Sequence, residues 1–180
     1  MTAFPEIEHG GLVQVGSGTL FPIVEELLKS GKHVEITVTG NSMYPMIRSL
    51  RDTVILESAS FDEVKKLDIV LVCRRTGKYV LHRLSKKEKH SFTIIGDRQD
   101  FFEKMNPAED IVIARAIAIR RGSRSIPCAS SKWRFIARIW LFLRPLRNML
   151  IILNGQLLPK VRRLFRFGKT PEKNQGNPKG

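Results

Sequence analysis

The sequence predicts a mainly β fold, in which an antiparallel sheet coils into a barrel-like domain with amphipathic helices before and after it. Between residues 54 and 119 the apolar residues form short runs separated by turns, and no run is long enough for a crossover helix between parallel strands. At residues 17–31 and 132–167, apolar residues instead recur at helical spacing. These two observations favour an antiparallel β domain flanked by helices.

The first expected element is an amphipathic helix over residues 17–31. Thr19 is a suitable N-cap, Pro22 is tolerated in the first turn, and Gly31 suits the end of a helix. Residues 1–16 have neither the basic start nor the apolar core of a secretory signal. The apolar face of the helix consists of Leu20, Ile23, Val24, Leu27 and Leu28.

Strands are expected wherever a short apolar run is bounded by turn residues. Residues 33–38 alternate between apolar and polar, the pattern of a half-buried strand. Residues 61–66 are expected to form a single helical turn, and the whole β domain is expected to extend over residues 17–122. The further strands are predicted at residues 54–56, 69–73, 79–84, 92–95 and 111–119.

A candidate nucleophile follows the first strand, in the stretch GNSMYP at residues 40–45. Gly40 and Asn41 tolerate a turn at the end of a strand, and Pro45 prevents a helix from following immediately. Ser42 is thereby presented near backbone N–H groups, the arrangement that a serine nucleophile and its oxyanion need. Taken alone, the stretch favours an ordinary turn serine over a nucleophile.

A candidate base lies in the strand predicted at residues 79–84. His82 and Arg83 are neighbours there, so their side chains point to opposite faces of the sheet. The next strand, at residues 92–95, ends in a Gly-Asp turn at Gly96 and Asp97.

These three segments resemble, in this order, the type I signal peptidase superfamily, which also contains the self-cleaving SOS-response repressors. The resemblance covers residues 33–120 and rests on GNSMYP at 40–45, LHRL at 81–84 and IGD at 95–97. It implies a catalytic β domain of the signal-peptidase and repressor type. In that superfamily the residue before the arginine of the second motif is the base. It is usually lysine, but it is histidine in the archaeal and endoplasmic-reticulum signal peptidases, which this sequence matches.

The resemblance implies a serine peptidase with a Ser42/His82 dyad. Many signal peptidases have a hydroxyl two residues before the nucleophile. This chain has Gly40 there, so the backbone N–H of Ser42 is the expected oxyanion donor.

A carboxylate is expected to fix the tautomer of His82. Asp97 is the first choice, with Asp100 and Glu103 as alternatives, because the histidine-type relatives use an acid several residues beyond the Gly-Asp motif. Asp97 is equally compatible with a turn residue. Arg83 is expected to pair with a carboxylate of this segment and to tie two strands together.

Two features depart from the family. Typical signal peptidases have an apolar membrane anchor before the serine, whereas the helix at 17–31 is too short and too acidic to span a bilayer. Where relatives have Gly-Asp turns, this chain has Arg-Asp at Asp52 and Leu-Asp at Asp68. We interpret both aspartates as turn formers without a catalytic part.

Basic residues are concentrated in the last third of the chain. The net charge is +14, although residues 1–110 contain 16 acidic and 15 basic side chains. Residues 111–171 contain 14 basic side chains and no acidic one. The shift in composition predicts a linker at 123–131 and, at 168–180, a disordered tail rich in Lys, Pro, Gly and Asn.

Residues 132–167 are expected to form basic amphipathic helices. Arginines interrupt each apolar run well before the ~20 residues that a spanning helix needs. Such helices lie in the interface of an anionic membrane, with aromatic side chains in the lipid. Packing on the β domain ranks second and binding to nucleic acid third, and a spanning insertion stays open. The residues expected to bind the membrane are Trp133, Arg134, Arg138, Trp140, Arg144 and Arg147.

No cofactor or metal is expected. Cys73 and Cys128 have no metal-ligand spacing and indicate no structural disulfide, which fits a reduced, cytosolic setting. His9, His33 and His90 lie in polar surroundings and are interpreted as surface residues.

The sequence therefore predicts a serine endopeptidase that acts on a peptide or protein at the cytoplasmic face of the inner membrane. Self-processing, as in the SOS repressors, is the alternative within the enzyme class, although no Ala-Gly or Cys-Gly pair precedes Ser42. A non-catalytic β domain that binds peptides or a membrane partner is the alternative from another class. An exposed Ser42 within hydrogen-bond reach of His82 would favour catalysis, and a buried or distant pair would favour the binding module.

Overall fold

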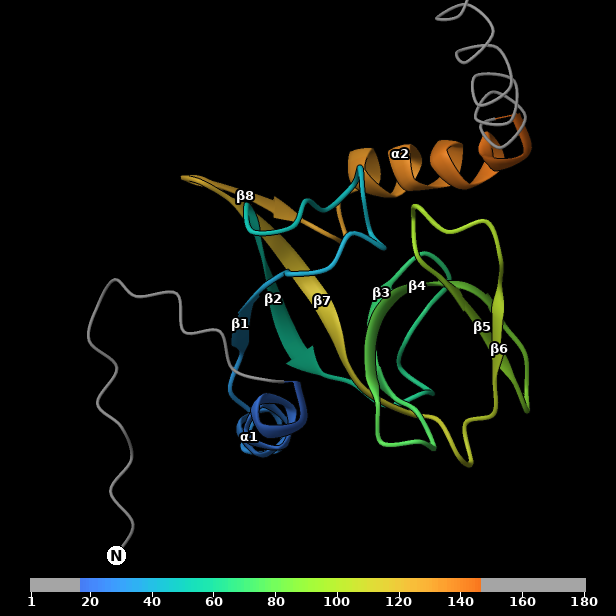
Figure 1. The fold of residues 1–180 in the computed structure, drawn as a ribbon. Helices are drawn as coiled ribbons and strands as arrows, with labels where there is room; N and C mark the ends of the chain where they lie inside the picture. Colours follow the sequence, from blue (N-terminus) through green and yellow to red (C-terminus); the bar gives the residue numbers. More distant parts are fainter. Residues whose placement is uncertain (1–16, 147–180) are drawn as a thin grey trace, which may run out of the picture. The chain divides into compact units, whose positions relative to one another are not determined.

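A computed structural model describes residues 17–146 of the chain. Helix α1 (Ser17–Lys29) precedes the strands and helix α2 (Ser131–Phe142) follows them (Figure 1). The chain divides into two compact units between Ile139 and Trp140, and the sheet belongs to the first. Its strands are β1 (Val34–Thr37), β2 (Asp52–Ser58), β3 (Ile69–Cys73), β4 (Tyr79–Lys87), β5 (Phe92–Ile95), β6 (Glu103–Met105), β7 (Ile111–Arg121) and β8 (Arg124–Pro127).

All the described strands form one open antiparallel sheet, in the order β1-β2-β7-β3-β4-β5-β6. The long strand β7 lies at its centre (Figure 1). One edge of β7 pairs with β2, while its other edge pairs first with β3 and then with β8. The predicted mainly β class and antiparallel pairing are therefore confirmed.

The predicted strands at 69–73 and 92–95 coincide with β3 and β5. Two short strands were not predicted. Strand β6 gives little signal in the sequence, because only its Met105 is buried. Strand β8 lies within residues 123–131, which were expected to form a linker. Gly122, with φ 57°, makes the turn that returns β8 along β7. Residues 61–66 contain turns where a helical turn was expected.

The core includes a cluster of apolar side chains on one face of β3, β4 and β5. Val70 and Val72 of β3 pair with His82 and Val80 of β4, so all four side chains share that face. Burial of each aliphatic side chain contributes about 1.5–3 kcal/mol. His82 is thus placed at the border of an apolar cluster made by Ala59, Val64, Val70, Val72, Leu84, Phe92, Ile94, Met105 and Val112.

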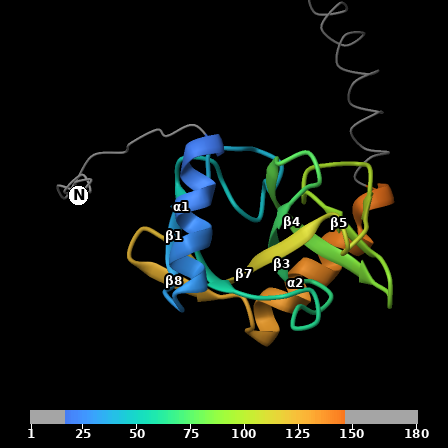
Figure 2. The same cartoon turned by 90° about the horizontal axis from the view of Figure 1, so that it is seen from below.

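Helix α1 packs against β1 and β2 (Figure 2). The Phe21 ring stacks on the Tyr79 ring with 4.5 Å between centroids, and the Tyr79 hydroxyl donates a hydrogen bond to Glu25 over 3.3 Å. Of the predicted apolar face, Val24 and Leu28 are buried. No helix in the described range 17–146 is long and apolar enough to cross a membrane.

Several arginines of the basic last third form ion pairs with acids earlier in the chain. Arg121 of β7 pairs with Asp52, and Arg134 of α2 pairs with Asp68, at 2.9 and 2.8 Å. Arg115 and Arg120 pair in the same way with acids of β2 and β1. The change in charge near residue 111 therefore does not mark the edge of the folded sheet.

Candidate active site

Ser42 lies in the loop between β1 and β2. The loop is anchored by side chains that it buries, namely Met43, Met46 and Ile47, whereas Ser42 itself is half-buried. Its backbone is closed by a hydrogen bond from the Ile47 N–H to the Met43 carbonyl, 2.9 Å long. The apolar residues around Ser42 thus hold the turn that the sequence predicted.

Asp52 fixes the far end of this loop. Its buried carboxylate accepts hydrogen bonds from the Arg48 N–H (2.9 Å), from Arg51 and from Arg121. Burial alone would raise the pKa of Asp52, but the hydrogen bonds from Arg51, Arg121 and the Arg48 N–H outweigh it and hold that pKa below its ordinary value. Asp52 is therefore an ionised anchor that connects the Ser42 loop to β7.

The Ser42 backbone docks on the turn that follows β5. The Arg98 N–H donates a 2.8 Å hydrogen bond to the Ser42 carbonyl oxygen. Gly96 allows this approach, because a Cβ there would lie 2.7 Å from the same oxygen. Within residues 17–146, the Ser42 N–H and hydroxyl make no hydrogen bond.

His82 lies in β4 and is only 4% exposed. Its Nδ1 atom lies 3.4 Å from Oε1 of Glu103, longer than an ordinary hydrogen bond, and this buried atom has no hydrogen-bond partner among residues 17–146. Sheet register explains the contact. Glu103 pairs with Ile94 and Ile94 with Leu84, which points to the same face as His82 two residues earlier.

Asp97, the first choice for the acid that orients His82, is instead bound to Arg83. Two hydrogen bonds, Nε to Oδ1 at 2.8 Å and Nη2 to Oδ2 at 2.6 Å, join these fully buried side chains. Arg83 also donates to the Leu67 carbonyl. Because Arg83 and His82 are adjacent in a strand, they point to opposite faces and contact different acids.

Of the alternatives for this acid, Asp100 is exposed and Glu103 is the one at His82. Arg74 forms an ion pair with the second oxygen of Glu103. Arg74 has no signal in the sequence, since its partner lies 29 residues further along the chain and no local pattern connects the two.

The surroundings of His82 favour its neutral form. Burial lowers the pKa of His82 below its ordinary value, the nearby Glu103 and Asp97 oppose this effect, and Arg74 adds to it. A neutral imidazole is the state in which a general base accepts a proton.

No hydrogen bond joins the Ser42 and His82 side chains in the described part of the chain. Catalytic hydrogen bonds are often long or misaligned before substrate binds. Among the described residues no group of His, Cys, Asp or Glu side chains is arranged to hold a metal ion. The candidate groups are the Ser42 hydroxyl, the His82 imidazole and the Glu103 carboxylate.

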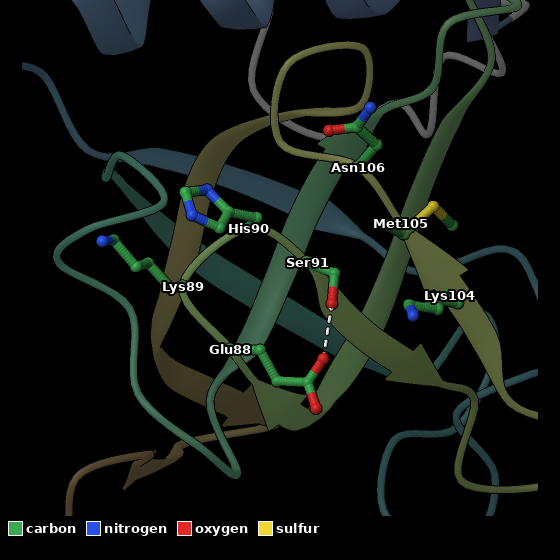
Figure 3. A pocket seen from close by; sticks show the side chains of 7 residues that line it. All are labelled: Glu88, Lys89, His90, Ser91, Lys104, Met105 and Asn106. Atoms are coloured by element: carbon green, nitrogen blue, oxygen red, sulfur yellow. Dashed lines mark hydrogen bonds between the residues drawn. The ribbon is translucent and has the colours of Figure 1, made fainter.

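A surface pocket lies elsewhere, between the β4–β5 turn and the residues around β6 (Figure 3). The Ser91 hydroxyl there donates a 2.7 Å hydrogen bond to Glu88 and points away from the His90 ring. Ser91 and His90 therefore do not form a nucleophile and base. The pocket is lined by Glu88, Lys89, His90, Ser91, Lys104, Met105 and Asn106 and contains no predicted catalytic residue.

The residues expected to bind a membrane have mixed surroundings. Trp133 is buried, and Arg134 is bound to Asp68 and to the Lys66 carbonyl. Arg138 is exposed, Trp140 is half-buried, Arg144 is buried, and Arg147 lies outside the described residues. The large apolar side chains that α2 exposes are Phe135, Ile136, Ile139 and Phe142.

Comparison of the chain with models of known protein families and with curated protein sequences gave no match.

Proposed function

We propose that this protein is a serine endopeptidase of the type I signal peptidase superfamily, in its histidine-containing form. Ser42 is the nucleophile, His82 the general base and Glu103 the acid that orients His82. The observation that supports this proposal best is the buried His82, whose Nδ1 faces Glu103. The docking of the Ser42 backbone on the turn after β5 supports it further.

The reaction follows from the roles of these groups. Ser42 Oγ attacks the peptide carbonyl while His82 takes the hydroxyl proton. The Ser42 N–H donates a hydrogen bond to the oxyanion that forms. His82 then gives the proton to the leaving amine, which leaves an acyl-enzyme. Water, deprotonated by His82, hydrolyses the ester and restores Ser42. Glu103 stabilises the imidazolium that forms in both steps.

The same proposal assigns the fold of the sheet to this superfamily. We regard the open antiparallel sheet around β7 as the coiled β domain of this superfamily, with the serine loop between its first two strands. The three motifs lie in order in the β1–β2 loop, in β4 and at the end of β5, which supports this assignment.

The test is covalent labelling by a serine-directed fluorophosphonate, with the full chain in lipid vesicles. Wild type is compared with Ser42→Ala and His82→Ala, and Ser91→Ala is the matched control because its hydroxyl is held by Glu88. Labelling that is lost in the first two variants and kept in the third supports the proposal. Equal or absent labelling in all four proteins would reject the dyad and favour the non-catalytic β module.

Self-processing is distinguished by the product. Incubation of wild type alone, followed by mass spectrometry, reveals any cleavage within the chain, and dilution separates an intramolecular reaction from one between molecules. Cleavage at a rate independent of concentration that Ser42→Ala abolishes would favour the self-processing alternative.

We also propose that α2 holds the protein on an anionic membrane surface, on the cytoplasmic side. The supporting observation is that α2 has two apolar sides. Trp133 and Ala137 are buried, while Phe135, Ile139 and their neighbours are exposed with the basic Arg138 nearby. Packing within the protein uses the side with Trp133 and Ala137, so the exposed side with Phe135 and Ile139 is left to contact lipid.

Vesicle sedimentation tests this membrane contact. Binding to vesicles that contain phosphatidylglycerol should fall about tenfold in Phe135→Ser, which removes much of one exposed apolar side chain. Vesicles of phosphatidylcholine alone should bind weakly. Equal binding of wild type and variant, or stronger binding to nucleic acid than to vesicles, would contradict it.

A further inference from the structure

Glu103 is shared between two partners. Its Oε1 faces Nδ1 of His82 at 3.4 Å, and its Oε2 is paired with Nη2 of Arg74. The side chain of Glu103 is 14% exposed and that of His82 6%. Charge interactions in such a shielded place are stronger than at the surface.

Arg74 reaches Glu103 from a fixed position. It begins the turn between β3 and β4, where its N–H donates to the Lys78 carbonyl and its own carbonyl accepts from the Gly77 N–H, at 2.9 and 2.8 Å. Gly77 has a φ of 74°, which suits glycine in this turn. The backbone of Arg74 is therefore tied to the hairpin that contains His82, while its guanidinium contacts β6.

Two acids influence His82, and each has its own arginine. Glu103 of β6 is paired with Arg74, and Asp97, after β5, is paired with Arg83. An unpaired carboxylate beside a buried imidazole stabilises the imidazolium. A base that is already protonated in the resting enzyme cannot accept the proton of Ser42.

We infer that Arg74 is a positioning residue of the site, which fixes Glu103 with one oxygen toward His82 and offsets the charge of that carboxylate. Charge-assisted hydrogen bonds of Arg to a carboxylate fix geometry as well as charge. Glu103 can then select the tautomer of His82 and stabilise the imidazolium during reaction, while the resting imidazole stays neutral. The role in catalysis rests on the proposed peptidase function, whereas the contact among the three side chains does not.

The first measurement is the titration of His82 by NMR in the full chain with isotope-labelled histidine. The His82 signals are assigned by their loss in His82→Gln. Arg74→Gln should raise the pH at which His82 takes up its proton, and Glu103→Gln should lower it. Arg75→Gln is the matched control, because it removes the same charge one residue further on from a side chain that is 74% exposed. Circular dichroism confirms that each variant is folded.

The second measurement is kinetic and follows the labelling of Ser42 by the fluorophosphonate at increasing reagent concentration. Arg74→Gln should lower the limiting labelling rate about tenfold with little change in the reagent concentration that gives half of it, and should move the acid limb of the pH profile of this rate to higher pH. Arg74→Lys, which keeps the charge, should recover the pH profile but only part of the limiting rate.

An unchanged His82 titration in Arg74→Gln, or an equal change in Arg75→Gln, would overturn the inference. Wild type that neither cleaves nor is labelled would reject the peptidase function instead, and the titration would still decide whether Arg74 acts on His82 through Glu103.

Discussion

Gly96 and Ser42 approach each other so closely that a Cβ on residue 96 would lie 2.7 Å from the Ser42 carbonyl oxygen. The Arg98 N–H donates a hydrogen bond to the same oxygen, so backbone atoms of the serine loop and of the turn after β5 are in direct contact. A side chain at residue 96 would need one of the two backbones to move. The glycine of the Gly-Asp turn is thus needed for its packing against the loop that contains Ser42.

Gly96→Ala should therefore displace Ser42. Overpacking of this kind costs about 1–3 kcal/mol, and a shift of the nucleophile should reduce the rate of Ser42 labelling at least about tenfold. Gly40→Ala is the control, because nothing lies within 4 Å of a Cβ at that position. Equal labelling rates in the two variants would show that the contact at residue 96 does not position Ser42.

Substitution of Asp97 should mainly reduce stability, whereas substitution of Glu103 should mainly reduce the reactivity of Ser42. Asp97→Asn leaves the fully buried Arg83 without its ionic partner and should lower the free energy of unfolding by about 3–5 kcal/mol. Glu103→Gln should change the free energy of unfolding by about 1 kcal/mol or less. It should reduce the rate of Ser42 labelling about 10- to 100-fold. Urea denaturation and the labelling assay measure the two effects. If Asp97→Asn greatly reduced the rate of Ser42 labelling but hardly changed the free energy of unfolding, the orienting role would return to Asp97.

Local patterns were sufficient for most strands. The run at 69–73 is continuously apolar and the run at 33–38 alternates, and both are direct signals of burial. Strand β8 has no such signal, since its residues are mostly exposed and it exists through pairing with β7.

The sequence offered Glu103 only as an alternative for the acid at His82, because the choice among the candidates depends on register. Asp97 is nearer in sequence, but the pairing of β5 with β6 brings Glu103 onto the face of His82. Trp133 illustrates the same limit. An apolar residue on an amphipathic helix is compatible with lipid or core, and only the tertiary structure shows that it is buried.

His82 should make stability depend on pH. Because the pKa of His82 is lowered in the folded protein, the unfolded chain binds more protons between that pKa and the ordinary value of about 6.5. The free energy of unfolding should therefore be highest above pH 6.5 and decrease as the pH falls through that value. Urea denaturation at pH 7.5 and 5.5 measures this, and the decrease should be smaller in His82→Gln. An equal decrease in both proteins would assign it to other groups.

Arg134 and Arg138 of α2 should have separate roles. Arg134 binds Asp68 and the Lys66 carbonyl, and the neighbouring Leu67 carbonyl accepts from Arg83. Arg134→Ala should therefore lower the free energy of unfolding by about 1–2 kcal/mol without weakening binding to anionic vesicles. Arg138→Ala removes an exposed charge and should change stability by less than about 0.5 kcal/mol. It should instead weaken vesicle binding by about 1 kcal/mol, the contribution of one basic residue near an anionic surface. Denaturation and sedimentation of the two variants separate these effects, and weaker vesicle binding in Arg134→Ala alone would mean that Arg134 leaves Asp68 to contact lipid.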